Sequence, residues 1–146
     1  TPPVLSSAAS DVYKRQKYLN ANAITDVTGF GLLGHLSEML IDEKLSANLI
    51  FDEVPIIEFA KSYFHSGIYP SGSQRNFDSV KDIISFEDQD EALLLADAQT
   101  SGGLLISAPA ETDIDLIEIE KIYGVFLKEI GNITDRYNQK INIISN

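Results

Sequence analysis

The sequence predicts an α/β (α+β) domain in which helices pack on one face of a mixed sheet. Helix-periodic stretches alternate with short apolar runs, in the order α, β, α, loop, β, α, β, α, β, β, which is typical of layered α/β proteins. The 146 residues fit one domain, and a hydrophobic content of 44% supplies a core of ordinary size.

The first 16 residues differ in composition from the rest. They contain mainly Pro, Ser and Ala without periodicity, and their basic residues come last, whereas a secretory signal begins with them. We expect residues 1–16 to be a disordered or non-native leader and residues 17–146 to form the domain.

Four helices are expected. The first runs from Gly31 to about Glu43, because apolar residues recur there at helical spacing. Pro55 can occupy the first turn of the second helix, whose apolar stripe extends to Phe64. The third covers 88–96 with Asp88 as N-cap, and the fourth covers 111–123 and stops at Gly124.

The expected strands are short. They cover 46–54, 82–86, 103–108, 125–133 and 140–144, and a polar turn at 135–139 joins the last two. A short extended piece is expected around 23–27, before the first helix. Residues 65–78 are rich in Gly, Ser and Pro and are expected to form a loop. A loop of that length in a compact domain is often functional.

Composition excludes several classes of function. The net charge is −11, and three of the eleven basic residues lie in the first 17 positions, so the basic cluster needed for nucleic-acid binding is missing. An anion such as ATP would have to be bound by backbone amides and metal ions. No apolar run approaches the roughly 20 residues that span a bilayer, so we expect a soluble protein without membrane contact. The absence of cysteine excludes disulfides and thiolate chemistry and agrees with a cytoplasmic location.

Residues 25–35 combine a carboxylate and two hydroxyls with three glycines that open a helix. These residues are Asp26, Thr25 and Thr28, followed by Gly29, Gly31 and Gly34. The unpaired N–H groups at a helix N-terminus suit phosphate, and a carboxylate beside them could hold the metal that accompanies a polyphosphate.

Two other interpretations of this motif were weighed. The glycine spacing matches the dinucleotide-binding fingerprint, with Asp52 further along, but the preceding residues are too polar for a central strand and Asp26 would repel a pyrophosphate. A capped helix, with Thr28 or Asp26 as N-cap, stays open beside the phosphate site. His35 is interpreted as a surface or interface histidine.

A second segment, residues 97–105, again combines an aspartate, hydroxyl side chains and glycines ahead of an apolar stretch. Thr100, Ser101 and Gly102 could form a hydroxyl-and-amide nest for an anion, or merely a turn into the next strand. The sequence shows no Ser/His/Asp set, no P-loop lysine and no pair of carboxylates that we would assign as general acid and base. We therefore assign no catalytic residue.

Together, three strings resemble one known family. TDVTGFGLLGH at 25–35, PSGSQRN at 70–76 and DAQTSGGLLIS at 97–107 look like the C-terminal half of selenophosphate synthetase (selenide, water dikinase), of the aminoimidazole ribonucleotide synthetase superfamily. The resemblance runs from about residue 17 to 144. It implies that ATP, selenide and water give selenophosphate, AMP and orthophosphate with Mg²⁺. It also implies an N-terminal domain that forms a homodimer and a C-terminal domain that closes over the nucleotide.

By position, the resemblance implies that Asp26 contributes to the magnesium–polyphosphate site. Asn76 and residues 100–102 would be structural or nucleotide-side residues. The family's reactive Cys or selenocysteine, its neighbouring lysine, its glycine-rich N-terminal segment and its other metal aspartates are absent. We therefore expect this chain to contribute to the Mg–ATP site but to be inactive alone. The alternatives are a domain of another ATP-dependent synthetase of the superfamily and a non-catalytic binding module.

Overall fold

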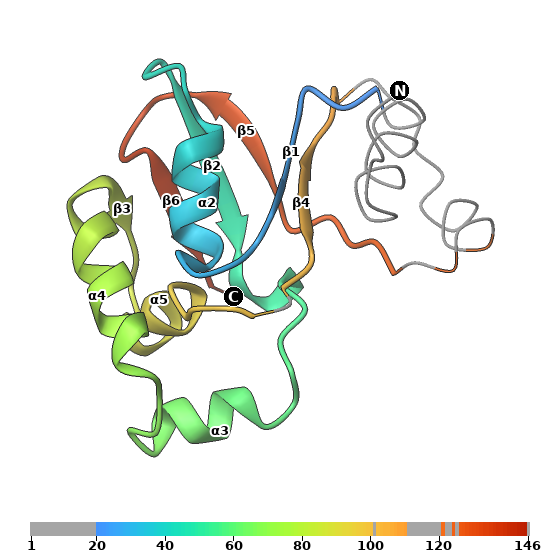
Figure 1. The fold of residues 1–146 in the computed structure, drawn as a ribbon. Helices are drawn as coiled ribbons and strands as arrows, with labels where there is room; N and C mark the ends of the chain where they lie inside the picture. Colours follow the sequence, from blue (N-terminus) through green and yellow to red (C-terminus); the bar gives the residue numbers. More distant parts are fainter. Residues whose placement is uncertain (1–19, 101, 111–120, 122–123, 125, 146) are drawn as a thin grey trace, which may run out of the picture.

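The computed structural model describes residues 20–100, 102–110, 121, 124 and 126–145. Its larger sheet has the strand order β3-β6-β2-β5 (Figure 1). Strand β2 (Leu45–Ile50) is parallel to β6 (Ile141–Ile144) and antiparallel to β5 (Gly131–Asp135), while β3 (Ile84–Ser85) is parallel to β6. The expected mixed sheet is confirmed.

Helices share a core with one face of this sheet. They are α2 (Gly31–Met39), α4 (Ser71–Val80) and α5 (Gln89–Leu95). Apolar side chains recur at alternate strand positions and at helical spacing, so strands and helices bury them against each other. The buried core includes Leu33, Leu36, Ala47, Leu49, Phe77, Val80, Leu93, Leu95, Ile141 and Ile143.

The strand residues between the apolar core positions carry polar side chains that hydrogen-bond across the sheet, and we call them the polar ladder. Asn48 on β2 is in register with Asn142 on β6, and the Asn142 amide donates to Asn48 Oδ1 at 3.3 Å. Ser85 Oγ on β3 donates to Asn142 Oδ1 at 2.9 Å, and Tyr137 donates to Asn48 Oδ1 at 2.8 Å. Because successive strand residues point to opposite faces, this ladder lies opposite the helices. For the described helices α2, α4 and α5, the prediction that helices pack on one face is confirmed.

The remaining strands form a separate two-stranded sheet. Strand β1 (Ala23–Asp26) pairs antiparallel with β4 (Leu104–Ser107), and Figure 1 shows the pair beside the larger sheet. The dinucleotide fingerprint requires a buried parallel strand before its first glycine. Since β1 is antiparallel and leads to Gly29, that interpretation is excluded.

The expected loop at 65–78 is wrong, because α4 begins at Ser71. Pro70 is extended at the N-cap position, and Ser73, Phe77 and Val80 are buried at helical spacing. Glycine, serine and asparagine have low intrinsic helix propensity, but burial of one face outweighs that preference here.

Several boundaries also differ from those expected. Helix α2 ends at Met39, because Asp42 begins a turn in which its Oδ1 accepts from the Lys44 N–H at 2.9 Å. Helix α3 (Ala60–His65) begins later than Pro55. Strand β2 ends at Ile50, where a 3₁₀ turn, η1 (Phe51–Glu53), follows.

The last strands are shifted as well. Strand β5 begins at Gly131, and the turn after it covers 136–140. A 3₁₀ turn, η2 (Lys81–Ile83), precedes the short β3.

The Asp88 N-cap is confirmed, since its carboxylate accepts from the Asp90 and Glu91 N–H groups. The leader at 1–16 and most of the expected helix at 111–123 lie outside the described residues.

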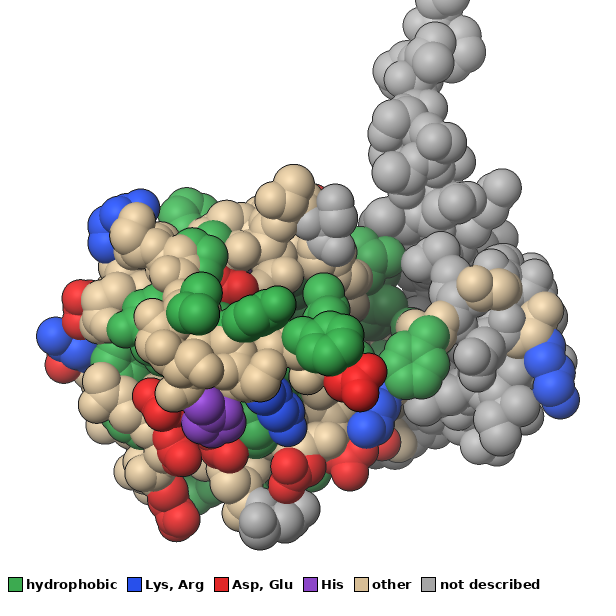
Figure 2. All heavy atoms as spheres, turned by 90° about the horizontal axis from the view of Figure 1, so that it is seen from below, with side chains coloured by type: hydrophobic (Ala, Val, Ile, Leu, Met, Phe, Trp, Pro, Cys, Tyr) green, Lys and Arg blue, Asp and Glu red, His purple; other side chains and the backbone are tan. Residues whose placement is uncertain are grey.

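Helix α3 and its flanks carry an exposed apolar surface. Figure 2 shows hydrophobic side chains gathered on the face seen from below, with acidic side chains along their border. The members of this α3 surface are Ile57, Phe59, Tyr63 and Ile68. Within the described part of the chain, no helix is long and apolar enough to span a bilayer.

Candidate functional site

Three segments far apart in the sequence meet beside the first turn of α2. The Asn76 side chain on α4 donates from Nδ2 to the carbonyl oxygens of Gly29 at 2.8 Å and of Ala96 at 3.0 Å. The Gln99 N–H donates to the Thr28 carbonyl at 3.0 Å. We call these segments, residues 27–31, 73–76 and 96–100 with 102–103, the three-motif junction.

Two glycines let the backbones of the junction approach closely. Gly31 has φ +71°, and a Cβ there would lie 2.6 Å from the carbonyl carbon and oxygen of Ala96. A Cβ at Gly102 would overlap the Val27 carbonyl oxygen. Gly29, in contrast, is exposed and would have nothing within 4 Å of its Cβ. Gly31 and Gly102 are therefore structural, while the backbone at Gly29 stays open to a ligand.

A second polar contact joins α4 to the segment after α5. The buried Ser73 hydroxyl donates to Asp97 Oδ1 at 2.5 Å, and Gln99 Nε2 donates to Asp97 Oδ2 at 3.2 Å. Both oxygens of this carboxylate are engaged, so Asp97 fixes the junction. This pair has no signature in the sequence, because no local pattern connects residues separated by 24 positions.

His35 is buried, which corrects its interpretation as a surface residue. Its Nε2 lies 3.1 Å from Thr28 Oγ1, and its Nδ1 lies 3.7 Å from Glu38 Oε2. The Phe30 ring packs against the imidazole with centroids 5.6 Å apart. A Cβ at Gly34 would come within 2.7 Å of Phe30 Cβ, so this glycine makes room for that ring.

The helix-cap interpretation of Asp26 and Thr28 is wrong. The N-cap residue of α2 is Phe30, and it makes no side-chain capping hydrogen bond. Asp26 ends β1 with an exposed side chain, and Thr25 Oγ1 donates to its backbone carbonyl at 3.3 Å. Within the described residues no hydrogen bond or ion pair engages the Asp26 carboxylate. This carboxylate is therefore available to a ligand.

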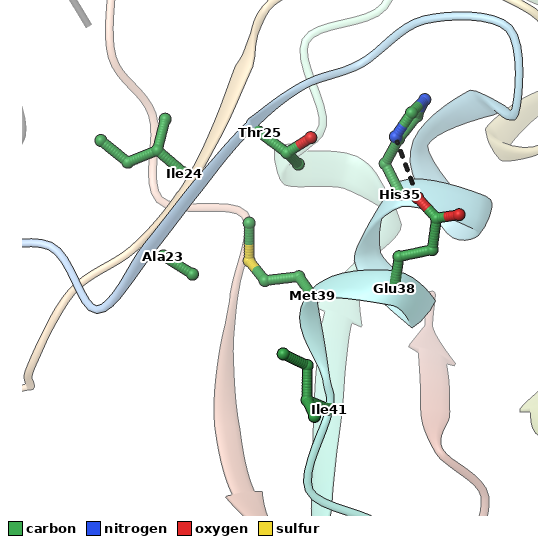
Figure 3. Close-up of a pocket in the computed structure, with 7 residues that line it drawn as sticks. All are labelled: Ala23, Ile24, Thr25, His35, Glu38, Met39 and Ile41. Carbon is green, nitrogen blue, oxygen red and sulfur yellow. Dashed lines mark ion pairs between the residues drawn. The ribbon is translucent and has the colours of Figure 1, made fainter. Parts of the chain in front are cut away.

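A shallow hollow lies between β1 and α2. Figure 3 shows Thr25 on one side and the His35–Glu38 pair on the other, with Met39 and Ile41 forming an apolar end. Its volume of about 210 Å³ is below the roughly 300–1,000 Å³ of typical small-molecule sites. The hollow alone is too small to enclose a nucleotide.

The metal-binding capacity of the described residues is limited. They contain no group of three or more His, Asp or Glu side chains that could hold a metal ion. Asp26 and the nearby hydroxyls offer oxygen atoms, the ligands that Mg²⁺ prefers. The chain thus fits a magnesium site as one contributor. Thr100 is exposed at the edge of the junction, and Ser101 lies outside the described residues.

Known proteins are similar to this chain over most of its length. The family described as "AIR synthase related protein, C-terminal domain" matches residues 11–144. A protein named selenide, water dikinase from Shewanella baltica is 45% identical over 128 residues, which is 88% of this chain and 36% of that protein. Another of the same name from Pseudomonas aeruginosa is 39% identical over 122 residues, which is 84% of this chain and 36% of that protein.

The fold also resembles a solved structure. Thiamine-monophosphate kinase from Stenotrophomonas maltophilia matches with a TM-score of 0.53 at 20% identity, over 88% of this chain and 33% of that one. At that identity the likeness concerns the fold. The chain spans about a third of the length of the curated relatives that it matches.

Proposed function

Since the chain belongs to the AIR synthase related protein family, C-terminal domain, we propose that it is the C-terminal part of a selenide, water dikinase. Relatives with that name are similar over most of this chain. The observation that carries the proposal is the exposed Asp26 carboxylate. It stays unengaged among the described residues, while its neighbours hold the three-motif junction together.

The proposed reaction converts ATP, selenide and water into selenophosphate, AMP and orthophosphate. Asp26 would bind Mg²⁺ through its carboxylate oxygens. When bound, the ion neutralises charge on the phosphate oxygens. The open backbone at Gly29 and the hydroxyls of Thr25 and Thr100 would face the phosphates, and Asn76 and Gly102 would keep these groups in place.

This chain would supply only part of the active site. A phosphoryl transfer needs charge neutralised from several sides around positioned reactants. One free carboxylate and a hollow of about 210 Å³ do not provide that. We propose that the other metal ligands and the nucleotide pocket come from an N-terminal domain of a homodimeric enzyme. That domain would account for the greater length of the relatives.

The proposed domain occupies residues 17–146, and residues 1–16 form the leader. The family match begins inside that segment, at residue 11. Deletion of residues 1–16 should leave the free energy of unfolding unchanged if the boundary is right.

A chimera tests the proposed function. Residues 17–146 replace the corresponding segment of the Shewanella baltica relative, and AMP and orthophosphate are measured with ATP, Mg²⁺ and selenide. We expect selenide-dependent release of both products by the chimera and none by the isolated chain. A folded chimera that releases neither product would contradict the proposal, as would an isolated chain that releases both.

A further inference from the structure

Thr28, His35 and Glu38 form a hydroxyl–imidazole–carboxylate series, and its first member lies two residues after Asp26. The imidazole bridges its neighbours, with Nε2 at 3.1 Å from the Thr28 oxygen and Nδ1 at 3.7 Å from the Glu38 carboxylate. Burial of His35 and packing against Phe30 hold the ring in this orientation. Figure 3 shows the His35–Glu38 pair at the rim of the hollow.

In the neutral form of the ring, the Glu38 carboxylate 3.7 Å from Nδ1 influences which nitrogen holds the proton. A neutral imidazole has one N–H and one lone pair, and the group facing one nitrogen determines the role of the other. A carboxylate within 4 Å attracts an N–H and repels a lone pair. Glu38 therefore favours the proton on Nδ1, which leaves Nε2 as an acceptor.

The tautomer in turn orients the Thr28 hydroxyl. A threonine hydroxyl has one proton and two lone pairs. If Nε2 accepts that proton at 3.1 Å, Thr28 Oγ1 retains only lone pairs for other partners. Such an oxygen can accept from the water shell of a cation or bind the cation directly, but it cannot donate to a phosphate oxygen.

We propose that His35 is a positioning residue that makes Thr28 Oγ1 an acceptor and so assigns Thr28 to the cation side of the site. Glu38 orients His35, His35 orients Thr28, and Thr28 joins Asp26 in binding hydrated Mg²⁺. When a residue that hydrogen-bonds to a metal ligand is substituted, metal affinity or activity typically falls 10–100-fold. The inference rests on the proposed function for the identity of the cation.

Nitrogen NMR of the 146-residue chain tests the tautomer without any ligand. The expected spectrum has pyrrole-type Nδ1 and pyridine-type Nε2 at His35, and Glu38→Gln should shift the population toward protonated Nε2. His65 is the matched control, because its Nδ1 lies 2.7 Å from the Lys61 carbonyl and should not respond to that substitution. A protonated Nε2 in the unsubstituted chain would overturn the inference.

The chimera tests the consequence for the cation. Thr28→Val and His35→Phe keep the shape of each side chain but remove the polar atoms. We expect both to raise the Mg²⁺ concentration for half-maximal activity at least ~10-fold, with a smaller change in KM for ATP. His35→Gln should restore most of the loss, because its amide oxygen can accept from Thr28. Thermal unfolding shows whether each variant is folded.

The outcomes separate the two proposals. A raised KM for ATP at unchanged Mg²⁺ dependence would make Thr28 a donor to phosphate and overturn the assignment to the cation side. An unsubstituted chimera without activity would contradict the proposed function itself. The tautomer would still be decided by the spectrum of the isolated chain.

Discussion

The three-motif junction and the segment around α3 differ in how far apart in the sequence their hydrogen-bonded residues lie. In the junction, Asn76 binds a carbonyl 47 residues away, and Ser73 binds a carboxylate 24 residues away. Around α3, Ser62 and Ser66 bind carbonyls only three or four residues back. The polar contacts of the junction therefore hold the tertiary structure, whereas those around α3 stabilise one helix.

The same contrast applies to side-chain burial. Large apolar residues on the α3 surface are more than half exposed, whereas in the junction Gly31 and Gly102 are packed tightly against neighbouring backbone. The motifs that resemble a known family thus consist mostly of residues that hold the structure. Asp26 differs from these residues, because no hydrogen bond or ion pair among the described residues engages its carboxylate.

The largest expected effect on stability is that of Gly31→Ala. A Cβ there would meet the backbone of Ala96 at 2.6 Å, and φ is +71°, so we expect a loss of about 3 kcal/mol or more in the free energy of unfolding. Gly67→Ala is the matched control, because φ is +72° but nothing lies within 4 Å. It should cost about 1–2 kcal/mol. Urea denaturation measures both, and equal costs would contradict the packing argument.

A smaller effect is expected for Asn76→Ala. The substitution removes two hydrogen bonds and leaves two carbonyls without that donor, so it should cost about 2 kcal/mol. Gln74→Ala in the same helix removes only a contact of 3.4 Å to Asp78 and should cost less than about 0.5 kcal/mol. If the two variants unfold at the same urea concentration, Asn76 does not hold the junction.

The smallest effect is expected on the α3 surface. Tyr63→Ala should change the free energy of unfolding by less than about 0.5 kcal/mol, because the side chain is 56% exposed. The adjacent Phe64 is buried, and Phe64→Ala should cost about 3 kcal/mol. A large loss for Tyr63→Ala would mean that this surface is part of the core.

Local patterns predicted much of the fold. The Asp88 cap, the start of α2 at Gly31 and the β1 and β4 strands follow from short-range signals such as apolar spacing and capping chemistry. Helix α4 was missed because its residues favour turns and its buried face is visible only after packing. The start of β5 was missed because it depends on pairing with β2, which is distant in the sequence.

For the candidate site, the sequence predicted which segments carry polar motifs, but not how those segments contact one another. The motifs at 25–35, 70–76 and 97–107 were recognised separately, but their joining through Asn76 depends on tertiary structure. The burial of His35 was missed because its place on the helix predicted the polar side, whereas Phe30 and Thr28 cover it. Such contacts follow from packing and have no signature in local spacing.

The most direct test of the account is Asp26→Asn, measured for activity in the chimera and for stability in the isolated chain. Loss of a direct metal ligand should lower activity more than loss of a residue that only hydrogen-bonds to such a ligand. We therefore expect activity to fall more than ~100-fold. The free energy of unfolding should change by less than about 0.5 kcal/mol, as for the exposed control Glu43→Gln, which should also keep full activity. Undiminished activity of Asp26→Asn, or a loss of activity explained by unfolding, would contradict the account.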